Sequence, residues 1–216
     1  MRLFVALALP GHLKRELAIL AGGIPGARWV PPENYHVTLR FVGEQPGHRA
    51  AEIDEALAGL RGRGFSLALC GLGTFEKAGR TTALWVGAER NEALDRLRAK
   101  IENALQRIGL EPERRRFSPH VTLARVDGAA EQRLAAYVQA HNLFRTEPVE
   151  IGHFTLFSSR LGKEQPVYTP EVEYTLARSV QPQGMPAARA PLPASSETAT
   201  GEAGLRDGRG GSRSRE

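Results

Sequence analysis

The chain has 216 residues, of which 41% are hydrophobic and 25% charged, and its formal net charge is +5. This balance is typical of an ordinary soluble globular protein, and the chain is long enough to bury a core as one large domain or two small ones. A single cysteine, Cys70, excludes a disulfide framework, and we expect it to be a buried structural thiol. The apolar N-terminus lacks a small-residue cleavage site and no segment is long enough to cross a membrane, so we expect a cytoplasmic protein.

Apolar periodicity in the first half of the chain predicts alternating strands and helices. A helix over 11–21 is expected because leucines recur there at helical spacing, and Gly22-Gly23 would end it. The other elements expected in this half are strands over 2–9, 35–41, 65–70 and 83–87 and a helix over 48–60.

The second half of the chain repeats this order of elements. Its longest helix is expected over 91–108, with Gly109 ending it. The other expected elements are strands over 119–126, 149–157 and 168–176 and a helix over 130–141. Beyond Arg178, Pro, Ala, Gly, Ser and Arg dominate and the apolar periodicity ends. We therefore predict one domain over 1–178 and a disordered tail over 179–216.

One tetrapeptide occurs twice and anchors the functional interpretation. His36-Val37-Thr38-Leu39 returns letter for letter as His120-Val121-Thr122-Leu123, each time in a predicted strand. Successive strand side chains point to opposite faces, so each copy places its histidine and threonine on one face and its two aliphatic side chains on the other. Each strand would then present an imidazole beside a hydroxyl, which suits a site for a small anionic group.

The repeated tetrapeptide and the repeated element order indicate an internal duplication. Two equivalent lobes related by a pseudo-twofold axis would bring both motif strands to one shared cleft. A third His-x-Thr triplet, beginning at His153, has no histidine at the corresponding place in the first half. We therefore expect His153 to lie outside the site.

Positive charge is densest at Arg114-Arg115-Arg116, shortly before the second tetrapeptide. A solvated face and a phosphate-attracting rim are equally compatible with such a cluster. The modest excess of positive charge over the whole chain favours a polyanionic partner only mildly.

Two paired histidines favour general acid–base chemistry, because one imidazole can act as base while the other acts as acid. The sequence lacks the spacings of a metal site, a Gly-x-Ser-x-Gly nucleophile and a phosphate-binding Gly-x-x-x-x-Gly-Lys loop. Opening of a strained 2′,3′-cyclic phosphate by water requires only an acid, a base and groups that hold phosphoryl oxygens. From the residues alone, a phosphodiesterase acting on small cyclic nucleotides and a non-catalytic RNA-binding protein also stay open.

Several segments together resemble a known family. They are Met1 to Ala6, Trp29-Val30, His36 to Glu44, Leu84 to Gly87, Phe117 to Arg125 and Phe154 to Ser159. On these segments the chain resembles the two-histidine (2H) phosphoesterases, specifically the RNA 2′,3′-cyclic phosphodiesterases, also called 2′-5′ RNA ligases. The resemblance implies an α+β fold of two pseudo-symmetric lobes, each an antiparallel sheet with outer helices, on either side of a central cleft.

The same resemblance implies a role for each motif residue. His36 would be the proton donor and His120 the proton acceptor, while Thr38, Thr122 and Arg125 would bind the substrate. Strict alternation puts Arg125 on the face opposite His120, so that role requires a bulge or the end of the strand.

The resemblance also implies an RNA substrate with a 2′,3′-cyclic phosphate end, with transfer RNA fragments among the candidates. It implies a hydrolase without metal or cofactor, acting as a monomer without an obligate protein partner and away from membranes. Reversible 2′-5′ ligation stays open.

Overall fold

The computed structural model describes residues 1–126, 131–162 and 165–178. The tail expected over 179–216 lies outside the described residues, and its disorder stays a prediction. No helix within the described ranges has the length and apolarity that a membrane crossing requires.

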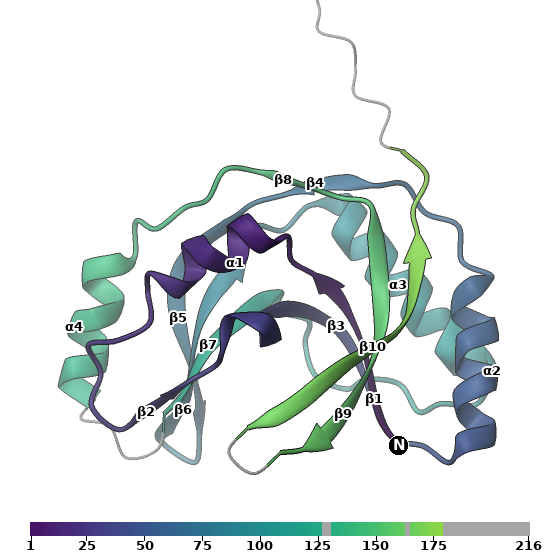
Figure 1. Ribbon diagram of the computed structural model, residues 1–216, viewed down its shortest axis with the longest axis horizontal. Coiled ribbons are helices and arrows are strands. Elements are labelled where there is room, and N and C mark those ends of the chain that lie inside the picture. The colour runs from purple at the N-terminus through teal and green to yellow at the C-terminus, as the bar shows by residue number, and fades with distance from the viewer. Residues whose placement is uncertain (127–130, 163–164, 179–216) are drawn as a thin grey trace, which may run out of the picture. The chain divides into compact units, whose positions relative to one another are not determined.

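The described strands form two four-stranded antiparallel sheets and a two-stranded ribbon (Figure 1). The first sheet has the order β10-β9-β1-β3, with β10 Pro166–Thr175, β9 His153–Leu161, β1 Arg2–Ala8 and β3 His36–Glu44. The second has the order β2-β7-β6-β5, with β2 Ala27–Trp29, β7 His120–Val126, β6 Arg80–Ala88 and β5 Leu69–Lys77. The ribbon pairs β4 Phe65–Leu67 with β8 Val149–Ile151. These sheets confirm the predicted α+β fold with two antiparallel lobes.

The α-helices of the described ranges cover the two sheets (Figure 1). They are α1 Gly11–Ala18, α2 Gly47–Ala58, α3 Glu92–Arg107 and α4 Glu131–His141, and a short 3₁₀ turn, η1, spans Pro32–Asn34. Helices α2 and α3 contact each other and lie against β10 and β3 of the first sheet, whereas α4 contacts β5 of the second. The helices are therefore on the outside of the lobes, as the resemblance implied.

Helix α3 shows how local sequence sets these elements. The Oδ1 atom of Asn91 accepts a hydrogen bond of 2.9 Å from the backbone N–H of Leu94, which caps the helix at its N-terminus. Buried side chains recur along one face of the helix, at Leu94, Leu97, Ile101 and Leu105. After the helix, Gly109 takes a positive φ of 82°, a conformation that favours glycine and lets the chain turn toward β7.

Each sheet combines strands from both halves of the chain. In the first sheet, β1 and β3 from the first half pair with β9 and β10 from the second. In the second sheet, β2, β5 and β6 from the first half join β7 from the second. The order β9-β1-β3 thus has its counterpart in β5-β6-β7. The duplication is real in topology, but the lobes do not correspond to separate halves of the sequence.

Both motif strands contain a β-bulge at the same leucine of the tetrapeptide. The residues on either side of Leu39 pair with successive residues of β1, so Leu39 has no partner there. Leu123 has the same position between β7 and β6. A single extra residue reverses the alternation of faces beyond it. Each strand therefore presents its histidine and threonine on one face, and after the bulged leucine the alternation of side chains between the two faces is shifted by one residue.

Two expected strands are broken in the structure. The segment 65–70 divides into β4 and β5, and 149–157 divides into β8 and β9 at Gly152. Strand β5 also extends to Lys77, which apolar alternation did not predict because Gly71 and Gly73 interrupt the apolar pattern. A Cβ atom on Gly73 would lie 2.3 Å from the ring of Trp85. Glycine is required there so that the indole can lie across β5. Helix α1 is also shorter than expected and ends at Ala18.

Candidate active site

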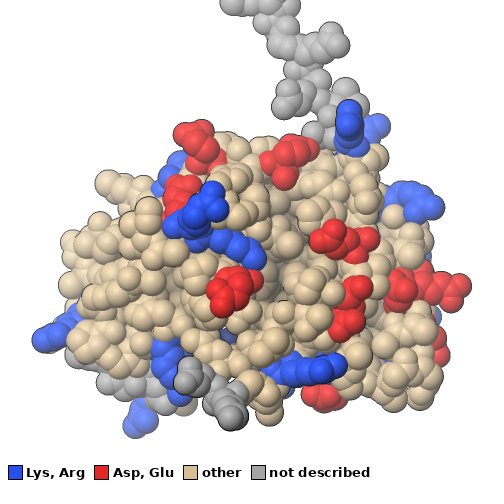
Figure 2. Space-filling view, viewed as in Figure 1, with Lys and Arg blue, Asp and Glu red and all other residues tan. Residues whose placement is uncertain are grey.

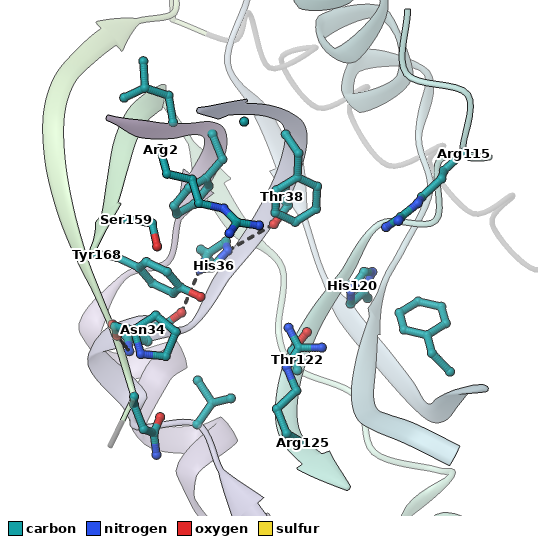
Figure 3. A pocket seen from close by; sticks show the side chains of 18 of the residues that line it. Arg2, Asn34, His36, Thr38, Arg115, His120, Thr122, Arg125, Ser159 and Tyr168 are labelled. Atoms are coloured by element: carbon teal, nitrogen blue, oxygen red, sulfur yellow. Dashed lines mark hydrogen bonds between the residues drawn. The ribbon is translucent and has the colours of Figure 1, made fainter. Parts of the chain in front are cut away.

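Strands β3 and β7 present the two His–Thr pairs to one cavity of about 760 Å³. Side chains from strands of both sheets line it, and β3 and β7 contact each other beside it. His36 and Thr38 project from one side of this cavity and His120 and Thr122 from the other (Figure 3). The structure thus brings together all four motif residues that the duplication predicted to share a cleft.

The two imidazoles have the same hydrogen-bonded orientation. Nδ1 of His36 lies 2.7 Å from the carbonyl oxygen of Asn34, and Nδ1 of His120 lies 2.7 Å from that of Ser118. A carbonyl oxygen can only accept, so each Nδ1 carries a proton and donates it. In both rings Nε2 is therefore the atom free to exchange a proton with a ligand. Nε2 of His36 lies 3.1 Å from the hydroxyl of Thr38.

Aromatic rings pack against both histidines and fix the ring planes. Phe4 lies 4.9 Å from His36, centroid to centroid, and Tyr168 meets the same imidazole edge-on at 5.3 Å. On the other side of the cavity, Phe75 meets His120 edge-on at 4.7 Å. This packing orients the rings and also removes water from around them.

Burial lowers the pKa of both histidines. It is the main cause of the fall in the His36 pKa from 6.5 to about 4; the bond to the Asn34 carbonyl opposes the fall, and the charge of His120 adds to it. For His120 the pKa is also lowered, first by burial and then by the positive charge of Arg125, against the bond to Ser118. Both imidazoles are therefore mainly neutral at pH 7 in the absence of a ligand.

Among the described residues four arginines line the cavity, and no described carboxylate forms an ion pair with any of them. They are Arg2, Arg28, Arg115 and Arg125. Among the described lining residues Glu113 is the one acid, and its carboxylate lies 3.8 Å from the guanidinium of Arg40. Acidic side chains are scattered over the face shown in Figure 2, with several on its right-hand side. The cavity therefore attracts anions.

The bulge at Leu123 explains why Arg125 faces the cavity, although strict alternation places it on the face opposite His120. Beyond the bulge the exposed face of β7 changes phase, and Arg125 faces the same cavity as Thr122. In β3 the equivalent position is occupied by Phe41, which is 53% exposed and also lines the cavity. At this equivalent position the β7 side of the site therefore carries a cation and the β3 side carries an aromatic ring.

The third His-x-Thr triplet lies apart from this cavity. His153 begins β9, opposite Thr175 of β10, and its Nε2 lies 3.8 Å from a carboxylate oxygen of Glu173. It is not among the residues that line the cavity. In the described ranges, moreover, no three His, Cys, Asp or Glu side chains cluster as a metal-binding set.

Sequence reasoning missed several residues of this cavity. Tyr168 comes from β10, far from either motif in the chain, and Asn34 fixes His36 through its backbone carbonyl. The side-chain amide of Asn34 also donates to the carbonyl of Pro166, and that of Gln165 donates to Trp29. These bonds attach the start of β10 to the segment before His36. The proximity of Asn34 to the motif was the one signal that the sequence offered.

The family model for LigT like phosphoesterases matches this chain twice, over residues 7–85 and over residues 86–168. The chain belongs to this family. Each match contains one His–Thr tetrapeptide, so the two matches agree with the internal duplication.

Named relatives and solved structures extend this family assignment. The RNA 2′,3′-cyclic phosphodiesterase of Aeropyrum pernix is 37% identical over 159 residues, which is 73% of this chain and 90% of that protein. The protein of the same name from Thermotoga maritima is 30% identical over 178 residues, covering 78% of this chain and 91% of its own length. A crystal structure of a Thermus thermophilus protein superposes with a TM-score of 0.67 at 26% identity, covering 81% of this chain and 97% of that one.

Proposed function

We propose that this LigT-like phosphoesterase hydrolyses 2′,3′-cyclic phosphodiester ends of RNA to 2′-phosphomonoesters. The observation that carries the proposal is the pair of equivalently oriented His–Thr faces on one arginine-lined cavity. The names of the relatives from Aeropyrum pernix and Thermotoga maritima support the same substrate class. An acid, a base and a set of phosphate-binding groups are the equipment that the reaction requires.

The proposed reaction exchanges one proton at each histidine. Nε2 of neutral His120 takes a proton from water, and the water oxygen attacks phosphorus. The bond from phosphorus to the 3′ oxygen breaks, and protonated His36 gives its Nε2 proton to that oxygen. The products are a 2′-phosphate and a free 3′ hydroxyl, and a proton must return to His36 before the next turnover.

Neutral hydrogen-bond donors and a cation would stabilise the negative charge on the non-bridging oxygens of the phosphoryl group. We assign Thr38 and Thr122 to the non-bridging oxygens, since each hydroxyl lies on the same strand face as its histidine. Arg125 would contribute a fixed positive charge at the same cavity, and it would also favour binding of the anionic substrate.

Turnover of a short RNA with a 2′,3′-cyclic phosphate end tests the proposal directly. We expect hydrolysis to a 2′-phosphate, identified by mass and by resistance of the product to a 3′-specific phosphatase. Because the proposed steps use proton transfer and hydrogen bonding alone, the rate should be the same with EDTA present. Hydrolysis of the cyclic mononucleotide but not of the RNA would favour a small cyclic nucleotide as substrate. Binding of RNA without turnover would instead indicate a non-catalytic protein.

The pH dependence of kcat/KM should follow the lowered pKa values of the free protein. The active form has one imidazole protonated and the other neutral, so the rate falls when both are protonated and when both are neutral. Because burial lowers both pKa values and that of His36 is about 4, the maximum should lie between about 4 and 6.5. Arg125→Ala removes a positive charge that disfavours protonated His120, so the limb of the profile that reports His120 should move to higher pH. NMR titration of the two imidazoles measures both pKa values, and a rate maximum above pH 7 would contradict the prediction.

A further inference from the structure

The segment between α3 and β7 brings one arginine of the Arg114–Arg116 cluster into the cavity. Arg115 lines it, whereas its exposed neighbours Arg114 and Arg116 do not. Arg115 points toward the site from beyond His120, on the side opposite Arg125 (Figure 3). The backbone of this segment is irregular, so something other than a sheet or helix must hold the arginine in place.

A buried ionic cluster holds this segment to the first motif strand. Arg40, two residues after Thr38, is 8% exposed and its Nε atom lies 2.8 Å from a carboxylate oxygen of Glu102, which is 7% exposed. The other carboxylate oxygen of Glu102 accepts a hydrogen bond of 3.0 Å from the backbone N–H of Glu113. Arg40 also donates to the carbonyl oxygens of Phe41 and Glu111. We call Arg40, Glu102 and Glu113 the brace.

The brace reaches Arg115 itself. A carboxylate oxygen of Glu113 accepts a hydrogen bond of 3.1 Å from the backbone N–H of Arg115, while its other oxygen lies 3.8 Å from Arg40. Two guanidinium groups, Arg40 and Arg98, lie within 4 Å of the carboxylates of Glu102 and Glu113, so the cluster as a whole is balanced in charge. The chain of contacts runs from β3 through α3 to the residues just before β7. It thus connects the two strands that carry the histidines.

Such a cluster is a poor source of stability, because desolvation of buried charges offsets most of their attraction. Burial alone would raise the pKa of Glu102, yet its pKa is lowered, because Gln106, the Glu113 N–H, Arg40 and Arg98 together outweigh burial. The carboxylate of Glu102 therefore stays charged, with one oxygen hydrogen-bonded and the other 2.8 Å from Nε of Arg40. Its value to the protein lies in positioning, and the group that it positions is the segment carrying Arg115.

We propose that Arg115 binds the backbone phosphate on the 5′ side of the nucleotide that carries the cyclic phosphate. The brace holds the segment that carries Arg115 in position for this contact. The inference rests on the proposed function. The two His–Thr pairs and Arg125 are assigned to the reacting phosphate. Arg115 and Arg125 lie on opposite sides of His120. An RNA with a cyclic phosphate at its 3′ end has a neighbouring phosphate on its 5′ side alone. Arg115 would therefore make the enzyme prefer oligonucleotides to cyclic mononucleotides.

The test compares Arg115→Ala with Arg114→Ala, which removes the same charge from the same segment but not from the cavity. For a trinucleotide with a cyclic phosphate end, Arg115→Ala should raise KM by roughly 5- to 30-fold more than it does for the cyclic mononucleotide. The slope of log KM against log salt should also fall by roughly 0.7, the value for loss of one phosphate contact on a single strand. Arg114→Ala should show no such difference between the two substrates.

A neutral linkage identifies the phosphate. When the neighbouring phosphate of the trinucleotide is replaced by methylphosphonate, wild type should lose its preference for the trinucleotide, and Arg115→Ala should add nothing further. An equal effect of Arg115→Ala on trinucleotide and mononucleotide would overturn the proposal, because Arg115 would then act on the reacting nucleotide. A trinucleotide-specific loss with Arg28→Ala and none with Arg115→Ala would also overturn it, since the RNA would leave by the other end of the cavity.

Arg40→Lys tests the positioning role of the brace. Lysine keeps a charge beside Glu102 but cannot hold Glu111 and Glu113 at the same time, so KM for the trinucleotide should rise while kcat is retained. In an Arg115→Ala background the same change should add nothing to KM. Additive effects would show that Arg40 does not act through Arg115.

Failure of the proposed function gives a different result from failure of this inference. If wild type hydrolyses neither substrate, binding of a trinucleotide that ends in a 2′-phosphate still measures the Arg115 contact. Weaker binding with Arg115→Ala than with Arg114→Ala would then support the contact. Equal binding of the two variants would overturn it.

Discussion

Replacement of either motif histidine by alanine should lower kcat/KM for a cyclic-phosphate-ended RNA by on the order of 10²- to 10⁴-fold. His36→Ala removes one of the two imidazoles whose Nε2 can exchange a proton in the cavity, and His120→Ala removes the other. His153→Ala should retain most activity, since this histidine lies outside the cavity and contacts Glu173. Steady-state rates of the three variants against wild type provide the measurement.

The control for this series is the folded state. Both motif histidines are partly buried, so each variant should be compared with wild type by its melting temperature and by its affinity for the 2′-phosphate product. A folded variant that binds product but does not turn over substrate locates the loss in proton transfer. If His153→Ala proved as damaging as the other two, the two-histidine site would be the wrong interpretation of this cavity.

The repeated tetrapeptide predicted the central part of the site because strand geometry is simple. Once His36 and His120 are placed in strands, alternation sets the positions of Thr38 and Thr122 without further information. The duplication added that the two strands share a cleft and that His153 has no counterpart. These inferences need only a period of two and a repeat.

The bulges were beyond such reasoning. Whether Leu39 and Leu123 each take a partner depends on the register with β1 and β6, and a register is a property of two strands. The bulge at Leu123 turns Arg125 toward the cavity and the one at Leu39 turns Phe41 toward it. The resemblance suggested a role for Arg125, but sequence periodicity alone contradicted that role.

Contacts between distant segments were also hidden from the sequence. Each sheet takes strands from both halves, which the order of elements did not reveal. Arg40 has no feature that marks it, yet it pairs with Glu102 on α3 and holds the carbonyl of Glu111. The run Arg114–Arg116 was compatible with a solvated face or a phosphate-binding rim, and the structure places Arg115 on the cavity and its two neighbours outside it. Tertiary packing decides such questions.

A substrate with sulfur in place of the 3′ leaving oxygen should restore most of the activity lost in His36→Ala, a recovery on the order of 10²- to 10⁴-fold. A thiolate is a far weaker base than an alkoxide, since a thiol has a pKa of about 8.5, and it can depart without a proton. The same substrate should not rescue His120→Ala, because water must still lose a proton as it attacks phosphorus. The comparison isolates the acid from the base.

The experiment matters because the two histidines are nearly equivalent in sequence and in hydrogen bonding, while the low pKa of His36 disfavours its role as proton donor. In the free protein the pKa of His36, at about 4, makes it a reluctant proton donor. A bound phosphate anion raises the pKa of any adjacent imidazole, so His36 as acid requires that it gain its proton as substrate binds. Under this assignment the alkaline limb of kcat should lie at higher pH than that of kcat/KM. Rescue of His120→Ala by the sulfur substrate, and not of His36→Ala, would make His120 the acid and leave the reaction itself unchanged.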